Sequence, residues 1–271
     1  MKFVDEETKS QLFFEKHGDG RHKLMVIHGY GMDHRSMEWA VQMALGDQDN
    51  VQIIYVDLPG MGKSTDVELS LNADKVVDIL VRLLDYIADG DSTVDLLGFS
   101  YGGYLVQGML SKASERIGQF MLLAPAYYGD FSQRSLPEQV NFDLEITDPI
   151  HTQEYGDHYL QLTGIPSLNG YSKFAENVQV GFNDANNEYL DVYSKTGYVF
   201  KDESRVHHTL VGNKGVIVLS MADHIVGYKD ILSAASNYPE TDYILLRNAG
   251  HIIHVDMADK VVQIIQSFFN Y

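Results

Sequence analysis

Short aliphatic blocks alternate with amphipathic segments along most of the chain. Each block ends in turn residues, and the six blocks are Lys23–Gly29, Asn50–Gly60, Thr93–Phe99, Gln119–Ala126, Gly215–Asp223 and Thr241–Gly250. Continuous apolar strands of this kind suit a sheet that is covered on both faces. Apolar residues at helical spacing fill Leu71–Asp89, which Asn72 could cap, and Met257–Tyr271. Ser10–His17, before the first block, is interpreted as an edge strand that could run antiparallel. Strands that alternate with helices predict an α/β protein with a mostly parallel sheet and right-handed crossovers.

One long segment breaks this alternation. From Tyr127 to about Lys214 there is no clean aliphatic block, and tyrosine, phenylalanine, amide and acidic residues dominate. The segment is too long for a simple connection, so we interpret residues 127–214 as a helical insertion within a single domain, residues 1–271. One of its helices is expected to begin at Pro149, with Asp148 as the N-cap.

Composition and charge narrow the classes of partner. The 271 residues carry a formal net charge of −18, and the lysines and arginines form no basic stripe. Nucleic acids and anionic membranes are therefore poor candidates, because the attraction to phosphate that drives such binding is missing. The chain has no cysteine, which excludes disulfides and thiolate metal sites. It shows neither an apolar signal core at the N-terminus nor a stretch of roughly 18 apolar residues. We expect a cytoplasmic protein that acts on a small molecule; its oligomeric state does not follow from composition.

A serine stands between two glycines where a predicted strand meets a predicted helix. In VDLLGFSYGG, Ser100 follows the strand and is flanked by Gly98 and Gly102. A sharp turn here would push the hydroxyl outward in a strained backbone, and side chains two residues away would collide with it. The helix would then direct its free N–H groups toward an anion formed at this point. The pattern predicts a nucleophilic Ser100.

A serine nucleophile needs a base, and the base needs an acid that orients it. Asp223 and His251 follow the last two aliphatic blocks, so all three residues lie at strand ends that meet at one edge of a parallel sheet. Taken alone, Asp223 could be a turn or cap residue and His251 an ordinary core or surface histidine. Together and in this order, they predict a Ser100–Asp223–His251 triad.

A second glycine-containing loop follows the first block. His28, Gly29 and Tyr30 stand where that strand ends, and we expect the backbone N–H groups of Tyr30 and Tyr101 to form an oxyanion hole. His28 could serve as a second base, but a histidine in this position more often shapes the loop through hydrogen bonds.

Other patterns do not carry chemistry in our interpretation. Asp57–Ser64 contains GMGKS, but the upstream glycine of the phosphate-binding G-x-x-x-x-G-K-[ST] loop is absent, so we predict a tight turn. His251 and His254 have no accompanying ligands that would make a metal site, and none is predicted. His207 and His208 are most simply a solvated pair.

The segments HGYGM, DLPGMGKS, GFSYGG, MADHIVG and NAGH together resemble the α/β-hydrolase superfamily. This resemblance implies an eight-stranded, mostly parallel sheet, a nucleophile–acid–histidine triad at Ser100, Asp223 and His251, and no cofactor. It also makes the insertion a cap over the substrate pocket. Tyr101 departs from the methionine, glutamine or leucine of many relatives, which leaves its backbone N–H in place.

Serine chemistry on this fold predicts hydrolysis of small or medium carboxylic esters. Two other hydrolases remain open: a C–C hydrolase of ring-cleavage products and an aminopeptidase that releases N-terminal proline. The peptidase would need acidic insertion residues, of which the sequence offers Asp143, Glu145, Asp148, Glu154 and Asp157. The insertion is no more acidic than the whole chain, so this acidity does not favour an amine pocket. A signalling protein that retains the triad is the third alternative.

Overall fold

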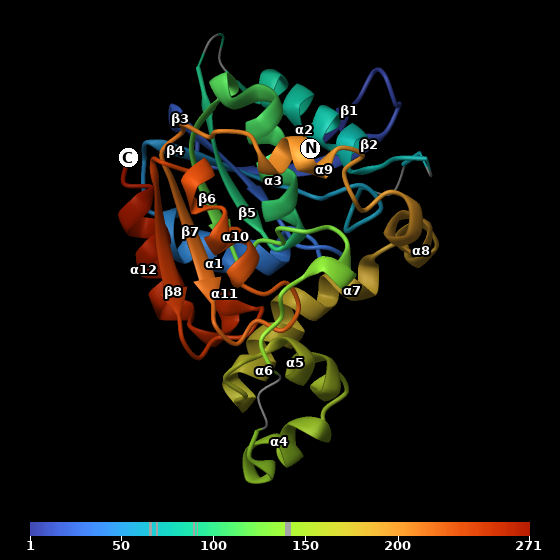
Figure 1. The fold of residues 1–271 in the computed structure, drawn as a ribbon, viewed down its shortest axis with the longest axis vertical. Helices are drawn as coiled ribbons and strands as arrows, with labels where there is room; N and C mark the ends of the chain where they lie inside the picture. The colour runs from blue at the N-terminus through green and yellow to red at the C-terminus, as the bar shows by residue number, and fades with distance from the viewer. Residues whose placement is uncertain (65–66, 69, 89, 91, 139–141) are drawn as a thin grey trace.

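The computed structural model describes residues 1–64, 67–68, 70–88, 90, 92–138 and 142–271. Within these residues, eight strands form one sheet in the order β1-β2-β4-β3-β5-β6-β7-β8 (Figure 1). The strands are β1 (Lys2–Val4), β2 (Gln11–His17), β3 (His22–Ile27), β4 (Val51–Val56), β5 (Val94–Phe99), β6 (Ile117–Leu123), β7 (Gly215–Ser220) and β8 (Thr241–Leu246). Strands β3 to β8 are parallel to one another, whereas β1 and β2 are antiparallel to their neighbours. The predicted α/β class and the mostly parallel sheet are confirmed.

The N-terminal edge of the sheet differs from expectation. Ser10–His17 does form an antiparallel strand, since Phe14 of β2 lies opposite Val56 of β4. It is not the edge, because β1 pairs on its outer side, with Phe3 opposite Leu12. Three residues are too few for a hydrophobic period to show in the sequence, so β1 escaped prediction.

Helices cover both faces of the sheet. They are α1 (Arg35–Leu45), α2 (Ala73–Ile87), α3 (Tyr101–Ala113), α4 (Leu144–His151), α5 (Gly156–Leu162), α6 (Leu168–Phe174), α7 (Val180–Asp184), α8 (Asn187–Thr196), α9 (Glu203–His207), α10 (Lys229–Ser233), α11 (Ile253–Asp256) and α12 (Ala258–Phe268). Side chains alternate along each strand, so Met25 and Ile27 pack with α2 and α3, whereas Leu24 and Val26 pack with α1 and α12. This double burial is why the strands appear in the sequence as unbroken aliphatic runs.

Two predicted helices are present. The predicted Leu71–Asp89 helix is α2, and the Asn72 Oδ1 accepts a hydrogen bond of 3.0 Å from the Lys75 N–H, as an N-cap does. The last residue of that prediction, Asp89, lies outside the described residues. The predicted C-terminal helix is α12. None of the helices in the described ranges combines the length and apolar character needed to cross a membrane.

The segment between β6 and β7 contains helices α4 to α9, and α4, α5 and α6 project beyond one end of the sheet in Figure 1. The predicted helix start at Asp148 and Pro149 is wrong. Helix α4 begins after Asp143, whose carboxylate accepts the Glu145 N–H at 2.9 Å, and Pro149 lies inside the helix. Starting at Leu144 lets the helix bury Thr147 and Ile150 one turn apart, and this burial offsets the hydrogen bond that proline cannot donate.

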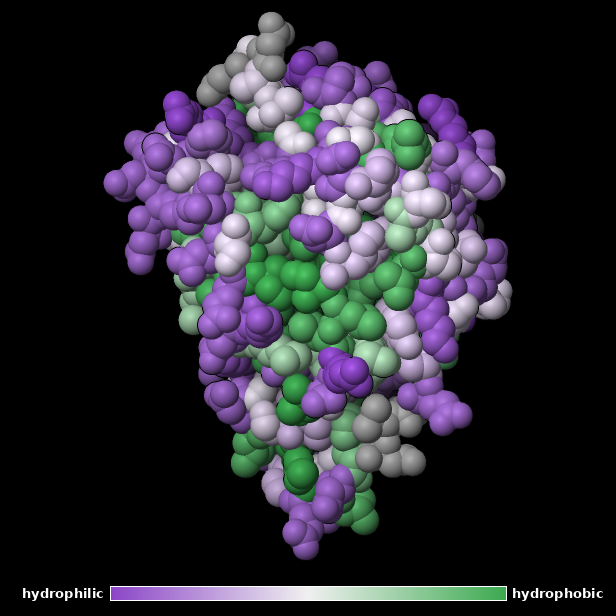
Figure 2. Space-filling view, turned by 60° about the vertical axis from the view of Figure 1, so that its left-hand side comes forward, coloured by the Kyte–Doolittle hydropathy of each residue, from purple (hydrophilic) through white to green (hydrophobic). Residues whose placement is uncertain are grey.

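One face of the molecule carries an exposed group of hydrophobic residues, although the net charge of the chain is large. Figure 2 views the protein from the side of β8 and α12 and shows a hydrophobic area bordered by hydrophilic residues. Leu245 on β8 and Leu232 on α10 are among the large hydrophobic residues that remain exposed. The hydrophilic residues are therefore not spread evenly over the surface (Figure 2).

Replacing Asn72 by alanine tests the cap of α2. The variant loses the acceptor for the Lys75 N–H, so we expect the free energy of unfolding to fall by about 1 kcal/mol. Denaturant titration measures this change. Asn72→Ser is the matched control, because its hydroxyl can accept the same bond and should restore most of the loss. Equal losses in both variants would show that capping is not what Asn72 contributes.

Candidate active site

Ser100 occupies the turn between β5 and α3 in a strained conformation. Its φ is 53° and its ψ is −115°, values that residues with a Cβ rarely adopt. The surrounding backbone fixes this geometry: the Ser100 N–H donates to Leu123 O at 2.9 Å, and the Ser100 carbonyl accepts from Tyr104 N and Ala126 N. The neighbouring strand β6 therefore holds the corner in which the hydroxyl sits.

Close backbone contacts explain the flanking glycines. A Cβ on Gly98 would lie 2.7 Å from the Gly102 carbonyl oxygen, and a Cβ on Gly102 would lie 2.3 Å from Ile27 O. The collision at Gly102 is thus with the end of β3, not with Ser100 itself. Gly103 is also required, because a Cβ there would meet Pro125 at 2.7 Å. No local pattern singles out Gly103, since its partner is 22 residues away.

The three predicted triad residues form one hydrogen-bonded chain. His251 Nε2 lies 2.8 Å from Ser100 Oγ, and His251 Nδ1 lies 2.8 Å from Asp223 Oδ2. The other carboxylate oxygen of Asp223 accepts the N–H groups of Ile225 and Val226 at 2.9 and 3.0 Å. All three triad side chains are buried. With Nδ1–H directed at the carboxylate, Nε2 is left as the acceptor for the serine proton.

The two predicted oxyanion donors are free in this structure. Neither the Tyr30 N–H nor the Tyr101 N–H donates a hydrogen bond to any other described residue. The side chains point elsewhere: the Tyr30 hydroxyl donates to Leu190 O at 2.7 Å, and the Tyr101 hydroxyl lies 2.6 Å from that of Tyr193. Burial raises the pKa of Tyr101 well above its usual value, so this hydroxyl stays neutral.

His28 links the loop after β3 to the loop after β4. Its Nδ1–H donates to Gly29 O at 2.7 Å, and its Nε2 accepts the Leu58 N–H at 2.9 Å. Burial lowers the pKa of His28, which keeps the ring in this neutral form. Both nitrogens are engaged with the backbone, so the ring is not available as a second base.

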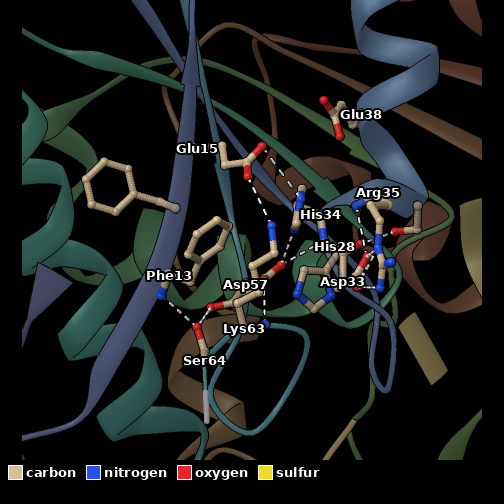
Figure 3. A network of polar contacts seen from close by, with 12 residues as sticks. Phe13, Glu15, His28, Asp33, His34, Arg35, Glu38, Asp57, Lys63 and Ser64 are labelled. Carbon is tan, nitrogen blue, oxygen red and sulfur yellow. Dashed lines mark hydrogen bonds and ion pairs between the residues drawn. The ribbon is translucent and has the colours of Figure 1, made fainter. Parts of the chain in front are cut away.

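Asp57–Ser64 forms a tight turn, as the sequence predicted. Gly60 and Gly62 have φ values of 73° and 51°, and the Gly60 N–H donates to Ser64 O at 2.8 Å. The Asp57 carboxylate fills the turn by accepting the Lys63 N–H, and it also accepts the backbone N–H and the ring Nδ1–H of His34 (Figure 3). This occupied turn leaves no backbone cradle for a phosphate.

A small group of surface side chains escaped the sequence analysis. The side chains of Glu15, His17 and Glu38 each offer one possible metal-ligand atom, and these atoms lie within 4.8 Å of one another, which is close enough to share a cation. Lys63 Nζ already contacts Glu15 at 3.2 Å, and His17 lies 3.4 Å from Glu38. All three side chains are part-exposed, so we interpret them as mutual ion pairs on the surface.

Two further histidines, His254 and His207, lie in different surroundings. His254 is buried edge-on against Phe99, with ring centroids 4.6 Å apart, and burial lowers its pKa to about 3. The prediction of a solvated His207–His208 pair is wrong for His207. That ring stacks on Tyr127 with centroids 3.9 Å apart, and its Nε2 bonds to Tyr127 O at 2.8 Å. The cause is tertiary: α9 returns to the end of β6, a contact that no local pattern reveals.

The chain belongs to the alpha/beta hydrolase family, whose model matches residues 24–264. It is 23% identical over 261 residues to the dihydrolipoyllysine-residue acetyltransferase component of an acetoin cleaving system from Pseudomonas putida, covering 94% of this chain but only 65% of that protein. It is also 23% identical over 258 residues to a proline iminopeptidase from Pestalotiopsis fici, covering 90% of each.

Solved structures show the same fold. An alpha/beta superfamily hydrolase from Oenococcus oeni superposes with a TM-score of 0.88 at 23% identity, covering 100% of this chain and 98% of that one. An esterase from Thermogutta terrifontis gives 0.75 at 18% identity, and a meta-cleavage product hydrolase from Pseudomonas fluorescens gives 0.68 at 16%; each match covers 100% of this chain and 97% of the other. Similarity at these identities establishes the fold and leaves the substrate open.

The His34–Asp57 pair predicts a pH-dependent stability. Burial opposes the charged form of each group, but their mutual hydrogen bond and charge prevail: the pKa of His34 is raised above 6.5 and that of Asp57 is lowered below 3.8. The contribution of His34 is present below pH 6.5 and disappears as pH rises through its raised pKa. That of Asp57 is present above pH 3.8 and disappears as pH falls through its lowered pKa.

We therefore expect His34→Gln to lower the melting temperature more at about pH 5.5 than at about pH 9, as thermal unfolding at the two pH values would measure. His208→Gln, at an exposed histidine, is the control and should show no such difference. A loss that is the same at both pH values would contradict the charged pair.

Proposed function

We propose that the protein hydrolyses small or medium carboxylic esters through an acyl-enzyme. The observation that carries this proposal is the unbroken chain of hydrogen bonds from Asp223 through His251 to Ser100 Oγ. A serine hydroxyl is a weak nucleophile at neutral pH, and an adjacent oriented imidazole is what activates it. In this proposal, residues 127–214 act as a cap that shapes the substrate pocket.

The steps follow from the positions of the side chains. His251 Nε2 takes the Ser100 proton as Oγ attacks the ester carbonyl, and then gives that proton to the departing alcohol. Asp223 holds the imidazole in its Nδ1–H form and stabilises the imidazolium. The free N–H groups of Tyr30 and Tyr101 supply donors for the oxyanion, each contributing roughly 2.7–4 kcal/mol in comparable sites. His251 then activates the water that releases the acid.

Solvent exposure argues against the aminopeptidase alternative. That activity would need acidic side chains held in the pocket to bind the substrate ammonium, but the insertion residues considered for this role are all exposed: Asp143, Glu145, Asp148, Glu154 and Asp157. An exposed carboxylate binds an ammonium weakly because water screens the pair. Esterases are among the structural neighbours, which agrees with the ester proposal without establishing it.

Hydrolysis of p-nitrophenyl esters of increasing acyl length tests the proposal. We expect turnover of short and medium chains, and a loss of about 10⁴-fold or more in Ser100→Ala, because the nucleophile is gone. Circular dichroism of the variant checks that it is folded. Proline p-nitroanilide is assayed in parallel. Release of nitroaniline without ester turnover would replace the ester proposal by the peptidase, and ester turnover unchanged in Ser100→Ala would overturn the mechanism.

Asp223→Asn tests the orienting role separately. The amide oxygen can still accept the Ile225 and Val226 N–H groups, but its NH₂ then faces His251 Nδ1 and favours the wrong tautomer. We expect kcat to fall about 10⁴-fold while the fold is kept. Measurement of kcat together with the melting temperature checks this. A variant with nearly full activity would mean that Asp223 only caps its turn.

A further inference from the structure

We propose that Asp256 is a positioning residue that fastens the His251 loop to the segment between β6 and β7. This inference rests on the proposed function, because it assigns Asp256 a part in orienting the general base. Asp256 is the last residue of α11, five residues after His251, and the imidazole bonds to Asp223 and Ser100, not to Asp256.

The Asp256 carboxylate connects two chain segments that are far apart in sequence. Its Oδ2 accepts the Gly250 N–H and the Gly164 N–H, each at 2.7 Å, and its Oδ1 accepts the Thr163 hydroxyl at 2.5 Å. Thr163 and Gly164 belong to the insertion, directly after α5, whereas Gly250 immediately precedes His251. One side chain therefore holds together the insertion and the loop that carries His251.

The backbones of the two segments are in direct contact around this carboxylate. A Cβ on Gly164 would lie 2.3 Å from Gly250 N, and a Cβ on Gly250 would lie 2.4 Å from Gly164 N. The His251 N–H also donates to Leu162 O at 2.8 Å. Two N–H groups thus converge in a crowded junction, and only an acceptor placed between them can satisfy both.

These bonds fix the peptide that carries the base. The N–H of Gly250 is held by Asp256 and the N–H of His251 by Leu162, so the peptide units on both sides of the Gly250 Cα are anchored to groups outside their own loop. The ring must place Nε2 and Nδ1 each at 2.8 Å from their partners. A shift of the loop by 1 Å would spoil both contacts, and misplacement of that size can cost on the order of 100-fold in rate.

The charge of Asp256 is not what the role requires. Burial raises the pKa of Asp256, while the bonds from Thr163, Gly164 and Gly250 oppose that shift. In Asp256→Asn the amide oxygen can take both glycine N–H groups, and the NH₂ can donate to the Thr163 hydroxyl oxygen. The asparagine variant therefore removes the charge and keeps the hydrogen bonds that join the two segments, whereas Asp256→Ala removes both.

The test measures the reactivity of Ser100 with a fluorophosphonate, which needs no knowledge of the substrate. Ser100 Oγ attacks phosphorus as His251 takes the hydroxyl proton, and fluoride leaves. We expect the labelling rate to fall between about 10- and 100-fold in Asp256→Ala and to stay within about threefold of the unmodified protein in Asp256→Asn. Thr163→Val removes the hydroxyl and with it the bonds to Asp256 Oδ1, Tyr159 and Ile165, but leaves both glycine N–H groups bonded to Asp256 Oδ2. It is the matched control and should label nearly as fast as the unmodified protein.

Steady-state kinetics on the best ester adds a measurement that a purely structural role would not change. If Asp256 positions the base, Asp256→Ala lowers kcat while its KM stays within about twofold of that of the unmodified protein. The variant is assayed well below its melting temperature. If the alanine variant does not fold, Asp256→Ser replaces it, because its shorter side chain cannot bridge Gly164 and Gly250.

The outcomes separate the two proposals. If the unmodified protein is labelled and folded Asp256→Ala is labelled at the same rate, the positioning role is overturned and the proposed function stays intact. Equal falls in the labelling rate of Asp256→Ala and Asp256→Asn would show that the charge matters and not the hydrogen bonds that join the two segments. This result would also overturn the positioning role. Absence of Ser100-dependent labelling in the unmodified protein would overturn the proposed function and this inference with it.

Discussion

The close approach of α3 to the end of β3 is the constraint on which the site depends. At Gly102 the first turn of the helix lies so near Ile27 O that no side chain fits between them. This contact, with the bond from Ser100 N to Leu123 O, forces the chain to reverse within one residue. The positive φ of Ser100 is the cost of that reversal, and hydrogen bonds to Leu123 O, Tyr104 N and Ala126 N hold the residue in place.

The parallel sheet then brings the other groups to the same edge. Asp223 and His251 follow β7 and β8, which lie beyond β6 from Ser100, so the carboxyl ends of these strands face one region. Short loops are enough to complete the hydrogen-bonded chain. The buried Asp223 carboxylate is tolerable because backbone N–H groups and the imidazole satisfy both of its oxygens.

The parts that the sequence predicted well are those governed by local patterns. Strands β3 to β8 appear as aliphatic blocks because both of their faces are buried, and Asn72 is recognisable as a cap because capping acts over three residues. The positions of Ser100, Asp223 and His251 follow from the ends of those blocks. Their hydrogen bonding depends on tertiary structure, yet the order of strand ends was sufficient to anticipate which residues meet.

What the sequence did not reveal depends on contacts between distant segments. Gly103 is needed because of Pro125, His207 is held by Tyr127, and Asp256 meets Gly164 across 92 residues. The start of α4 was mispredicted because two aspartates could each cap a helix, and only burial against the rest of the insertion decides between them. Helix α1, Arg35–Leu45, also went unrecognised between its two strands.

The insertion contacts the site from both sides, which limits how the two can vary independently. Tyr193 of α8 bonds to the Tyr101 side chain beside the nucleophile, and Leu162 bonds to the backbone of His251. A rigid displacement of the whole insertion would disturb the nucleophile turn and the base loop together. The residues between these two anchors make further contacts with the loops after β3 and β4: a Cβ on Gly181 would lie 2.6 Å from Asp33 N, and the Asn186 N–H donates to Gly60 O at 2.9 Å. The segment is therefore attached at several points to the loops that surround Ser100 and His251, so a change in its packing is passed on to those loops.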